Sequence, residues 1–216
     1  MVTQIDQLDI FDFDDTLFRS PGDTKENHDL YEKETGIPWV ISKSEAKELS
    51  EKFKKTIRPR SGWYGRIETL QHPFVPSPIP KEMWVQEVVE QFHESKQRPE
   101  TETVMMTGRH AGIQSAVLRI LHEGGLVESV LRNNKYYRVD NLVQCLFRGQ
   151  NGPDVPARVR PEDSTLEWKI WIIEKYMDFL PNVKTINIWE DREEHVDAFK
   201  SLNEITDLTI NVTHVQ

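Results

Sequence analysis

The chain has 216 residues, of which 37% are hydrophobic and 29% are charged, and its formal net charge is −9 at pH 7. This composition is typical of a globular protein and excludes a disordered or membrane-spanning chain, and the acidic balance argues against non-specific coating of nucleic acid. The length suits one domain with a small insert. Because Cys145 is the only cysteine and the first residues lack a signal-peptide pattern, we expect a cytoplasmic protein without an intramolecular disulfide.

The first half of the chain contains a strand and a helix with clear patterns. Apolar residues over 8–13 predict a buried strand, which polar, turn-like residues follow at once. A surface helix is predicted over 43–57, because Leu49, Phe53 and Ile57 lie four residues apart on one stripe.

The rest of the chain alternates helices with strands. Helices are predicted at 80–96, 111–123, 164–179 and 193–202, and strands at 102–106, 183–189 and 208–212. Residues 126–163 mix short β-like pieces with a loop rich in Pro and Gly. The alternation predicts an α/β fold with a mostly parallel sheet, in which ligands bind at the carboxyl ends of the strands.

Acidic side chains follow two of the predicted strands. Asp12 and Asp14 are two residues apart, so they point the same way if the backbone stays extended. Two neighbouring carboxylates repel each other unless a cation or a proton intervenes. Glu190 and Asp191 come directly after the strand over 183–189. Oxygen ligands of this kind suit Mg²⁺, which binds one or two carboxylates together with phosphate oxygens and water.

A hydroxyl and a lysine complete a candidate phosphate site. Thr107 closes the strand over 102–106, and Lys169 lies on the helix that begins near residue 164. A donor and a fixed positive charge at this position would stabilise a transferring phosphoryl group.

The four motifs together resemble those of the haloacid dehalogenase (HAD) superfamily. DFDDT, over 12–16, matches its DxDxT signature, and Thr107, Lys169 and Glu190-Asp191 follow in the order of its later motifs. FDFDDTLFRSP, GWYG, VMMTGRH and IWEDREEHVDAF resemble the HAD domain of "Swiss army knife" RNA repair proteins more narrowly. The T-G-R and E-D-R triplets are also similar to the 3′-phosphatase domain of phage-type polynucleotide kinase-phosphatases. The resemblance implies one doubly wound HAD-like domain over 1–216, with residues 19–100 as a cap-like insert between the first two motifs.

The resemblance also implies a role for each motif residue. Asp12 would be the nucleophile that forms an aspartyl-phosphate, and Asp14 would be the general acid and base. The remaining implied roles are phosphoryl binding by Thr107 and Lys169, bracing of the loop by Thr16, substrate binding by Gly108, Arg109 and Arg192, and Mg²⁺ binding by Asp12, the Asp14 main-chain carbonyl, Asp191 and Glu190. Asp15 is a departure, because members of the family often have Gly there.

The motifs do not decide between two classes of phosphorylated substrate, a nucleic-acid end and a nucleotide. The resemblance favours a phosphorylated nucleic-acid end, with a 3′-phosphate, or a nucleotide. Residues 52–66 hold six basic residues, no acidic one, and the aromatic residues Trp63 and Tyr64, a mixture that suits single-stranded nucleic acid. A second basic cluster lies at 132–138. Because no P-loop motif for a kinase is present, a domain that serves repair would be a stand-alone phosphatase or would work with separate repair-protein partners.

Two other functions are compatible with the same residues. One is a phosphatase of small nucleotides or sugar phosphates, which the acidic net charge favours slightly. The other is a binding module that keeps the fold without turnover. The intact set of Asp12, Asp14, Lys169 and Asp191 argues against such a module, because binding alone needs no general acid beside a nucleophile.

Overall fold

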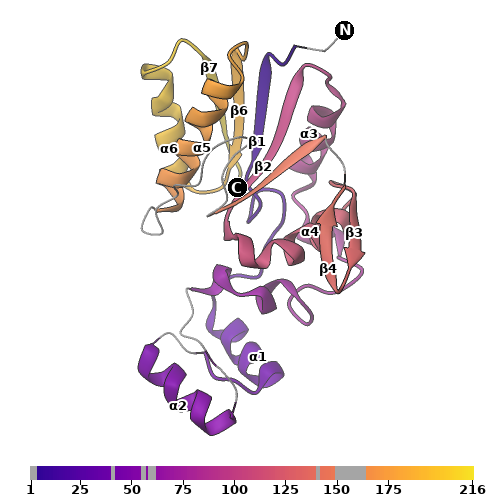
Figure 1. Ribbon diagram of the computed structural model, residues 1–216, viewed down its shortest axis with the longest axis vertical. Helices are drawn as coiled ribbons and strands as arrows, with labels where there is room; N and C mark the ends of the chain where they lie inside the picture. The colour runs from indigo at the N-terminus through magenta and orange to yellow at the C-terminus, as the bar shows by residue number, and fades with distance from the viewer. Residues whose placement is uncertain (1–3, 40–41, 55–56, 58–61, 140–141, 149–163) are drawn as a thin grey trace. The chain divides into compact units, whose positions relative to one another are not determined.

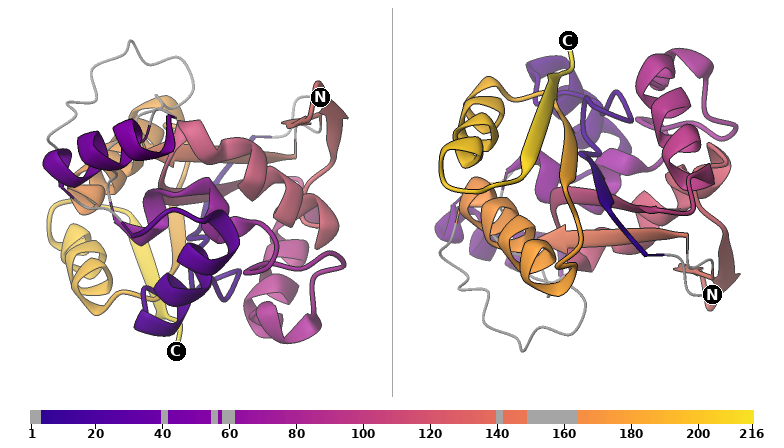
Figure 2. Two further views of the ribbon diagram at one scale, coloured as in Figure 1. Left: turned by 90° about the horizontal axis from the view of Figure 1, so that it is seen from below. Right: turned by 90° about the horizontal axis from the view of Figure 1, so that it is seen from above.

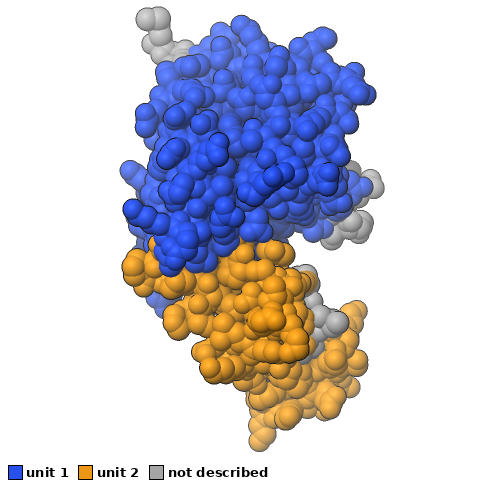
Figure 3. All heavy atoms as spheres, turned by 180° about the vertical axis from the view of Figure 1, so that it is seen from behind, with its two compact units in different colours: residues 1–19, 80–216 blue, residues 20–79 orange. Residues whose placement is uncertain are grey.

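The computed structural model describes residues 4–39, 42–54, 57, 62–139, 142–148 and 164–216. The chain forms two compact units, coloured separately in Figure 3: the first comprises residues 1–19 and 80–216, and the second comprises residues 20–79. The second unit is narrower than the insert predicted over 19–100, because residues 80–100 belong to the first unit. Among the described residues, none of the helices has both the length and the apolar character that crossing a bilayer requires.

The first unit is built on a five-stranded sheet whose strand order is β5-β2-β1-β6-β7 (Figure 1). Each neighbouring pair of strands is parallel, which confirms the predicted α/β class. The strands are β1 (Gln7–Phe11), β2 (Thr101–His110), β5 (Val143–Arg148), β6 (Thr185–Glu190) and β7 (Thr209–His214).

The order of the strands reverses at β1, so the sheet is doubly wound. From β1 the chain moves outward through β2 to β5, and it then returns to place β6 on the other side of β1. The carboxyl end of β1 therefore lies at a topological switch point, where doubly wound sheets bind their ligands.

Helices cover both faces of this sheet. In the views of Figure 2, α5 and α6 lie on one side of the strands, and α3 and α4 lie on the other. The side chains of Trp168, Ile172 and Phe199 belong to the main hydrophobic core, beneath α5 and α6. The helices are α3 (Gln86–Gln97), α4 (Gln114–Glu123), α5 (Thr165–Phe179) and α6 (Glu193–Ser201).

The alternation of side chains along β1 assigns its two faces. Leu8 and Ile10 are buried in the core cluster that includes α5 and α6. Asp9 and Phe11 point to the opposite face, where the ring of Phe11 lies 5.0 Å from that of Phe92 on α3. Asp9 is fully buried on that face, and its Oδ1 accepts a hydrogen bond from Asn187 Nδ2 at 2.7 Å. An acidic side chain inside the strand is thus compensated by a hydrogen bond from the neighbouring strand.

The predicted helix over 43–57 is too long at its C-terminal end. The helix α2 spans Lys43–Phe53 and ends because Lys54 adopts a left-handed conformation with φ 50°, in which its N–H bonds to the carbonyl of Ser50. Ile57 is nevertheless buried, in a cluster that includes Ala46. The apolar spacing identified a buried position correctly and assigned it wrongly to the helix.

Other elements had no prediction from the sequence. The helix α1 spans Lys25–Thr35, and Gly36 ends it with φ 65°. The region 126–163, which was hard to interpret, contains the antiparallel hairpin of β3 (Ser129–Arg132) and β4 (Lys135–Arg138) and the edge strand β5. Residues 149–163 lie outside the described part of the chain.

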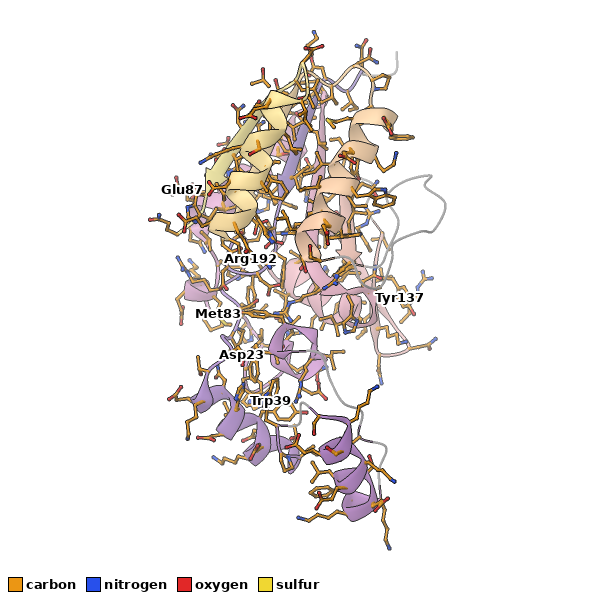
Figure 4. The ribbon with its side chains drawn as sticks, turned by 90° about the vertical axis from the view of Figure 1, so that its left-hand side faces the viewer. Asp23, Trp39, Met83, Glu87, Tyr137 and Arg192 are labelled. Carbon is orange, nitrogen blue, oxygen red and sulfur yellow. The ribbon has the colours of Figure 1, made fainter. Side chains whose placement is uncertain are left out.

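The basic and aromatic segment over 52–66 contributes to the interior of the second unit. Trp63 is fully buried, and its Nε1 donates a hydrogen bond to the carbonyl of Pro21 at 2.5 Å. The guanidinium of Arg66 is also buried and lies 3.3 Å from the ring centroid of Trp39 (labelled in Figure 4). These two side chains therefore offer no surface for stacking on a nucleic acid, contrary to the expectation for Trp63. Residues 55–56 and 58–61 of this segment lie outside the described residues.

Candidate active site

Asp12 lies directly after β1, at the switch point of the sheet. Its N–H donates a hydrogen bond to the carbonyl of Trp189 on β6 at 3.0 Å, which continues the pairing of β1 with β6 by one residue. Only 2% of Asp12 is exposed. The carboxylate is thus held at the carboxyl edge of the sheet by the backbone of the strand beside it.

The turn after Asp12 is closed by main-chain hydrogen bonds. Leu17 N and Phe18 N both donate to the carbonyl of Phe13, at 3.2 and 2.9 Å, and all three side chains are fully buried. Asp15 has a φ of 54°, in the left-handed region. Asp tolerates this conformation better than most residues do, which explains how it occupies a position where the family often has Gly.

Lys169 of α5 lies between two acidic side chains. Its Nζ is 2.9 Å from Asp12 Oδ1 and 2.7 Å from Glu190 Oε2, and all three side chains are at most 2% exposed. Burial alone would lower the pKa of Lys169, but the charges of Asp12 and Glu190 raise it above its usual value. The lysine is therefore a fixed positive charge beside the candidate nucleophile.

Glu190, the last residue of β6, is held from two directions. Besides the contact with Lys169, its Oε1 lies 3.3 Å from Nδ1 of the buried His195 and accepts a hydrogen bond from the N–H of Arg192 at 3.4 Å. Burial would raise its pKa, but His195 and Lys169 outweigh burial and lower the pKa to about 2. Glu190 is thus an ionised anchor for Lys169 over the whole neutral range.

The other two carboxylates of the cluster have raised pKa values. Burial raises the pKa of Asp12 to about 8; Lys169 opposes this effect, and Glu190, Asp14 and Asp191 add to it. Burial, together with the charge of Glu190, raises the pKa of Asp191 to about 6. The site therefore lacks positive charge relative to its carboxylates, and Lys169 alone does not balance them.

The acidic cluster has the donor set of a hard cation. One carboxylate oxygen from each of Asp12, Glu190 and Asp191 lies within 4.8 Å of the others. Both Asp12 oxygens and Asp191 Oδ1 are buried and have no hydrogen bond of normal geometry among the described residues, the contact of Asp12 with Lys169 being an ion pair. Buried carboxylate oxygens of this kind are the ligands that Mg²⁺ prefers. The residues present therefore fit Mg²⁺.

Asp14 is outside this acidic cluster and pairs with Arg109 of β2. Arg109 Nε lies 2.9 Å from Asp14 Oδ1 and 3.0 Å from Oδ2, and Nη2 lies 2.6 Å from Oδ1. Arg109 is 2% exposed, and the side chain of Asp14 is 14% exposed. Arg109, which was predicted to bind substrate, thus forms a bidentate ion pair with the candidate general acid.

Thr107 and Gly108 lie where the pairing of β2 with β5 becomes irregular, between Thr107 and His110. Thr107 is fully buried, and its Oγ1 accepts a hydrogen bond from Arg109 N at 3.2 Å, so its own hydroxyl proton can be donated elsewhere. A Cβ at Gly108 would come within 2.6 Å of Thr165 Cγ2, at the start of α5. Close packing of the β2 end against α5 therefore requires glycine here.

The two remaining predicted site residues have different surroundings. Thr16 is fully buried, and its hydroxyl has no hydrogen-bond partner among the described residues. Arg192 begins α6, near the carboxyl end of β6 (Figure 4), and its side chain is 41% exposed, with Nε 3.9 Å from Glu190 Oε1. Arg192 is therefore the accessible cation of the two predicted substrate-binding arginines.

Sequence reasoning missed two residues at this site, His195 and Thr165. The side chain of His195 is 1% exposed and contacts Glu190. Its place in the first turn of a helix that follows the acidic strand end was the available signal. Thr165 has no motif, and only the contact with Gly108 identifies it.

The chain is similar to a family model, to a yeast protein and to a bacterial domain. The family model "HAD domain family 1 in Swiss Army Knife RNA repair proteins" matches residues 45–216. The uncharacterized protein YMR265C of Saccharomyces cerevisiae is 25% identical over 206 residues, which are 94% of this chain and 38% of the yeast protein, so the chain spans well under half of that relative. The HAD domain of the effector protein Lem4 from Legionella pneumophila superposes over 99% of this chain and 88% of its own, with 10% identity and a TM-score of 0.41.

Proposed function

The chain belongs to the HAD domain family of Swiss Army Knife RNA repair proteins, and from this premise we propose that it is a Mg²⁺-dependent phosphomonoesterase that removes a terminal phosphate from a nucleic-acid end. The observation that carries the proposal is the state of Asp12. Its two oxygens are buried at the switch point of the sheet, beside Lys169 and two further carboxylates, and they accept no hydrogen bond of normal geometry from the described residues.

The proposed reaction begins with attack by a carboxylate oxygen of Asp12 on phosphorus. The bond from phosphorus to the ester oxygen breaks, the leaving alcohol takes a proton from Asp14, and the phosphoryl group stays on Asp12 as an aspartyl-phosphate. Water then attacks this phosphorus while Asp14 accepts its proton, and inorganic phosphate and free Asp12 are formed. Mg²⁺, held by Asp12 and Asp191 with Glu190 beside them, would neutralise the phosphate oxygens and so allow two anions to approach.

The neighbouring side chains would support both steps. Lys169 supplies positive charge 2.9 Å from the nucleophile throughout the cycle. The hydroxyl of Thr107 can donate to a phosphoryl oxygen, and Arg192, whose side chain is 41% exposed beside Glu190, can contact a phosphate of the substrate. We assign Arg109 to the positioning of Asp14, because three of its contacts are with that carboxylate.

The alternative substrates are small nucleotides or sugar phosphates. The net charge of −9 favours them, because a polyanion is repelled by an acidic protein. Membership of a family named for RNA repair proteins favours the nucleic-acid end.

The test is phosphate release by the purified protein with Mg²⁺, from a 3′-phosphorylated oligonucleotide, a 5′-phosphorylated one and a set of nucleoside monophosphates. We expect release from the 3′ end, loss of activity in EDTA and loss in Asp12→Asn. Asp197→Asn is a matched control, because this exposed aspartate lies on α6, away from the acidic cluster. Release from monophosphates alone would overturn the nucleic-acid assignment, and no release from any substrate would overturn the phosphatase.

A further inference from the structure

One surface of the first unit is basic, aromatic and unused by the proposed catalytic site. In the hairpin, Arg132 lies directly opposite Lys135, and Tyr137 is two residues farther along β4. Because directly opposite residues and residues two apart share a face, these three side chains lie on one side of the ribbon. We call this surface, made of Arg132, Lys135 and Tyr137, the hairpin face.

The opposite side of the ribbon is attached to α4. Tyr136 N donates a hydrogen bond to Ser115 Oγ at 2.8 Å, and the Tyr136 ring lies 5.9 Å from that of His122. Asn133 and Asn134 form the turn, with φ values of 50° and 58°, which Asn tolerates in tight hairpins. The fold thus fixes the hairpin face outward, and Tyr137 is seen at the outer margin of this unit (Figure 4).

The cations of the hairpin face have no acidic partner among the residues that the structure describes. Arg132 and Lys135 are exposed, and neither side chain makes a hydrogen bond or an ion pair in the described part of the chain. Tyr137 is 48% exposed, although exposure of an aromatic ring to water costs free energy. Two unpaired positive charges and an open ring are therefore available to an anionic, aromatic ligand.

The contacts of the hairpin with α4 give its direction along that helix. Ser115 is in the first turn of α4, which follows the carboxyl end of β2 through a short 3-10 turn. The hydrogen bond from Tyr136 to Ser115 places the end of the hairpin that carries the turn beside this first turn of α4. The start of the hairpin lies beside the other end of α4, because Ser129 N donates to His122 Nδ1 at 3.4 Å. The turn of the hairpin thus lies beside the end of α4 that follows the carboxyl end of β2.

We propose that the hairpin face binds the single-stranded segment next to the phosphorylated end of the substrate. Arg132 and Lys135 would contact phosphates of the strand, and the ring of Tyr137 would stack on a base. A single strand fits better than a duplex, because its bases are open to stacking. A second copy of this chain fits poorly, because its hairpin would bring the same unpaired charges. This inference rests on the proposed function for its substrate, but binding is measured without turnover.

The experiment measures binding of a fluorescein-labelled single-stranded RNA of 15 nucleotides with an unphosphorylated 3′ end, by fluorescence anisotropy at several salt concentrations. For Arg132→Gln/Lys135→Gln we expect weaker binding and a slope of log K against log salt that is smaller by about 1.4, since each single-strand phosphate contact contributes about 0.7. For Tyr137→Ala we expect roughly tenfold weaker binding, in the range for loss of one stacked base.

Matched controls lie at the opposite edge of the sheet. Lys184→Gln/Lys200→Gln removes the same charge from exposed positions at the start of β6 and the end of α6. Phe179→Ala removes a ring that is 49% exposed, at the end of α5. We expect near wild-type binding from both controls, and circular dichroism melts show whether each variant is folded.

Each outcome decides separately on the hairpin face and on the catalytic site. Equal losses in the control and hairpin variants, an unchanged salt slope in Arg132→Gln/Lys135→Gln, or no RNA binding by the wild type would overturn the inference. Equal competition by poly-glutamate would overturn it in favour of an acidic protein partner. Hydrolysis of 4-nitrophenyl phosphate, measured in parallel, reports on the proposed function alone, and we expect the hairpin variants to retain it. RNA binding without such hydrolysis would support the hairpin face and contradict the phosphatase.

Discussion

Arg109 holds Asp14 through both carboxylate oxygens, across a separation of 95 residues in the chain. The arginine is at the end of β2 and the aspartate is in the turn after β1, so the pair ties together two neighbouring strand ends. Bidentate pairs of this kind fix orientation as well as distance. The position of the proposed general acid is thus set from outside its own loop.

Replacement of Arg109 by Lys keeps the positive charge but removes the guanidinium group that contacts both oxygens of Asp14. We expect kcat for an oligonucleotide 3′-phosphate to fall by about 10²-fold, within the range for general acid–base catalysis. The decrease in kcat for 4-nitrophenyl phosphate is expected to be much smaller, because its leaving group departs as an anion with little need for protonation. Arg119→Lys, in the exposed pair with Glu123, is the control. Equal losses on both substrates would show that Arg109 acts otherwise than through Asp14.

Gly108→Ala is expected to lower activity through α5. The added methyl group would lie 2.6 Å from Cγ2 and 3.2 Å from Oγ1 of Thr165, so either this side chain or the start of the helix that carries Lys169 must shift. Thr165→Ala removes both atoms. The double variant is therefore expected to recover most of the kcat lost in the single one, a coupling that a double-mutant cycle measures. Simple addition of the two losses would contradict this explanation.

Lys169→Met leaves two buried carboxylates without their shared cation. Breaking a buried ion pair in this way costs about 3–5 kcal/mol, and urea unfolding without Mg²⁺ measures the loss. The double variant Asp12→Asn/Lys169→Met is expected to recover part of this stability, because one of the two charges is then gone. Both variants should lack phosphatase activity. A Lys169→Met protein as stable as the wild type would show that the lysine does not balance the cluster.

The stabilisation by Mg²⁺ is expected to increase with pH. The pKa is raised to about 8 for Asp12 and to about 6 for Asp191, so folding opposes the ionisation of both carboxyl groups. The stability of the metal-free protein therefore falls as the pH rises from the pKa values of the unfolded chain through those of the folded protein. Mg²⁺ competes with the protons and removes this loss. Thermal melts with Mg²⁺ and with EDTA, from pH 5.5 to 8.5, should show a widening difference in Tm. A constant difference would place the cation elsewhere.

The sequence predicted the order of the motifs better than the contacts between them. Periodicity and resemblance predicted that four site residues follow strand ends or lie beside them: Asp12, Thr107, Lys169 and Glu190. The parallel sheet brings these strand ends to one edge. Which cation faces which carboxylate could not be predicted. Lys169 lies between Asp12 and Glu190, and Arg109 faces Asp14. These pairings depend on the distances between strand ends and helix starts in the folded protein, which no local sequence pattern predicts.

The limits of local patterns are clearest in two short elements. The stripe of Leu49, Phe53 and Ile57 predicted one turn of helix too many, because the left-handed conformation of Lys54 depends on where the chain must turn and not on apolar spacing. The strands of the hairpin have four residues each, too few for alternation to be distinguished from a loop. Tertiary contacts decided both cases.

The most direct test of Asp12 as the nucleophile uses an oligonucleotide whose 3′-phosphate carries ³²P. The protein is mixed with this substrate and Mg²⁺, quenched in acid within milliseconds to seconds, and digested, and the labelled peptide is sequenced by mass spectrometry. We predict transient label on the peptide that contains Asp12, its transfer to inorganic phosphate, and neither in Asp12→Asn. Release of labelled phosphate by Asp12→Asn at the wild-type rate, with no label on the protein at any time, would contradict the proposed mechanism.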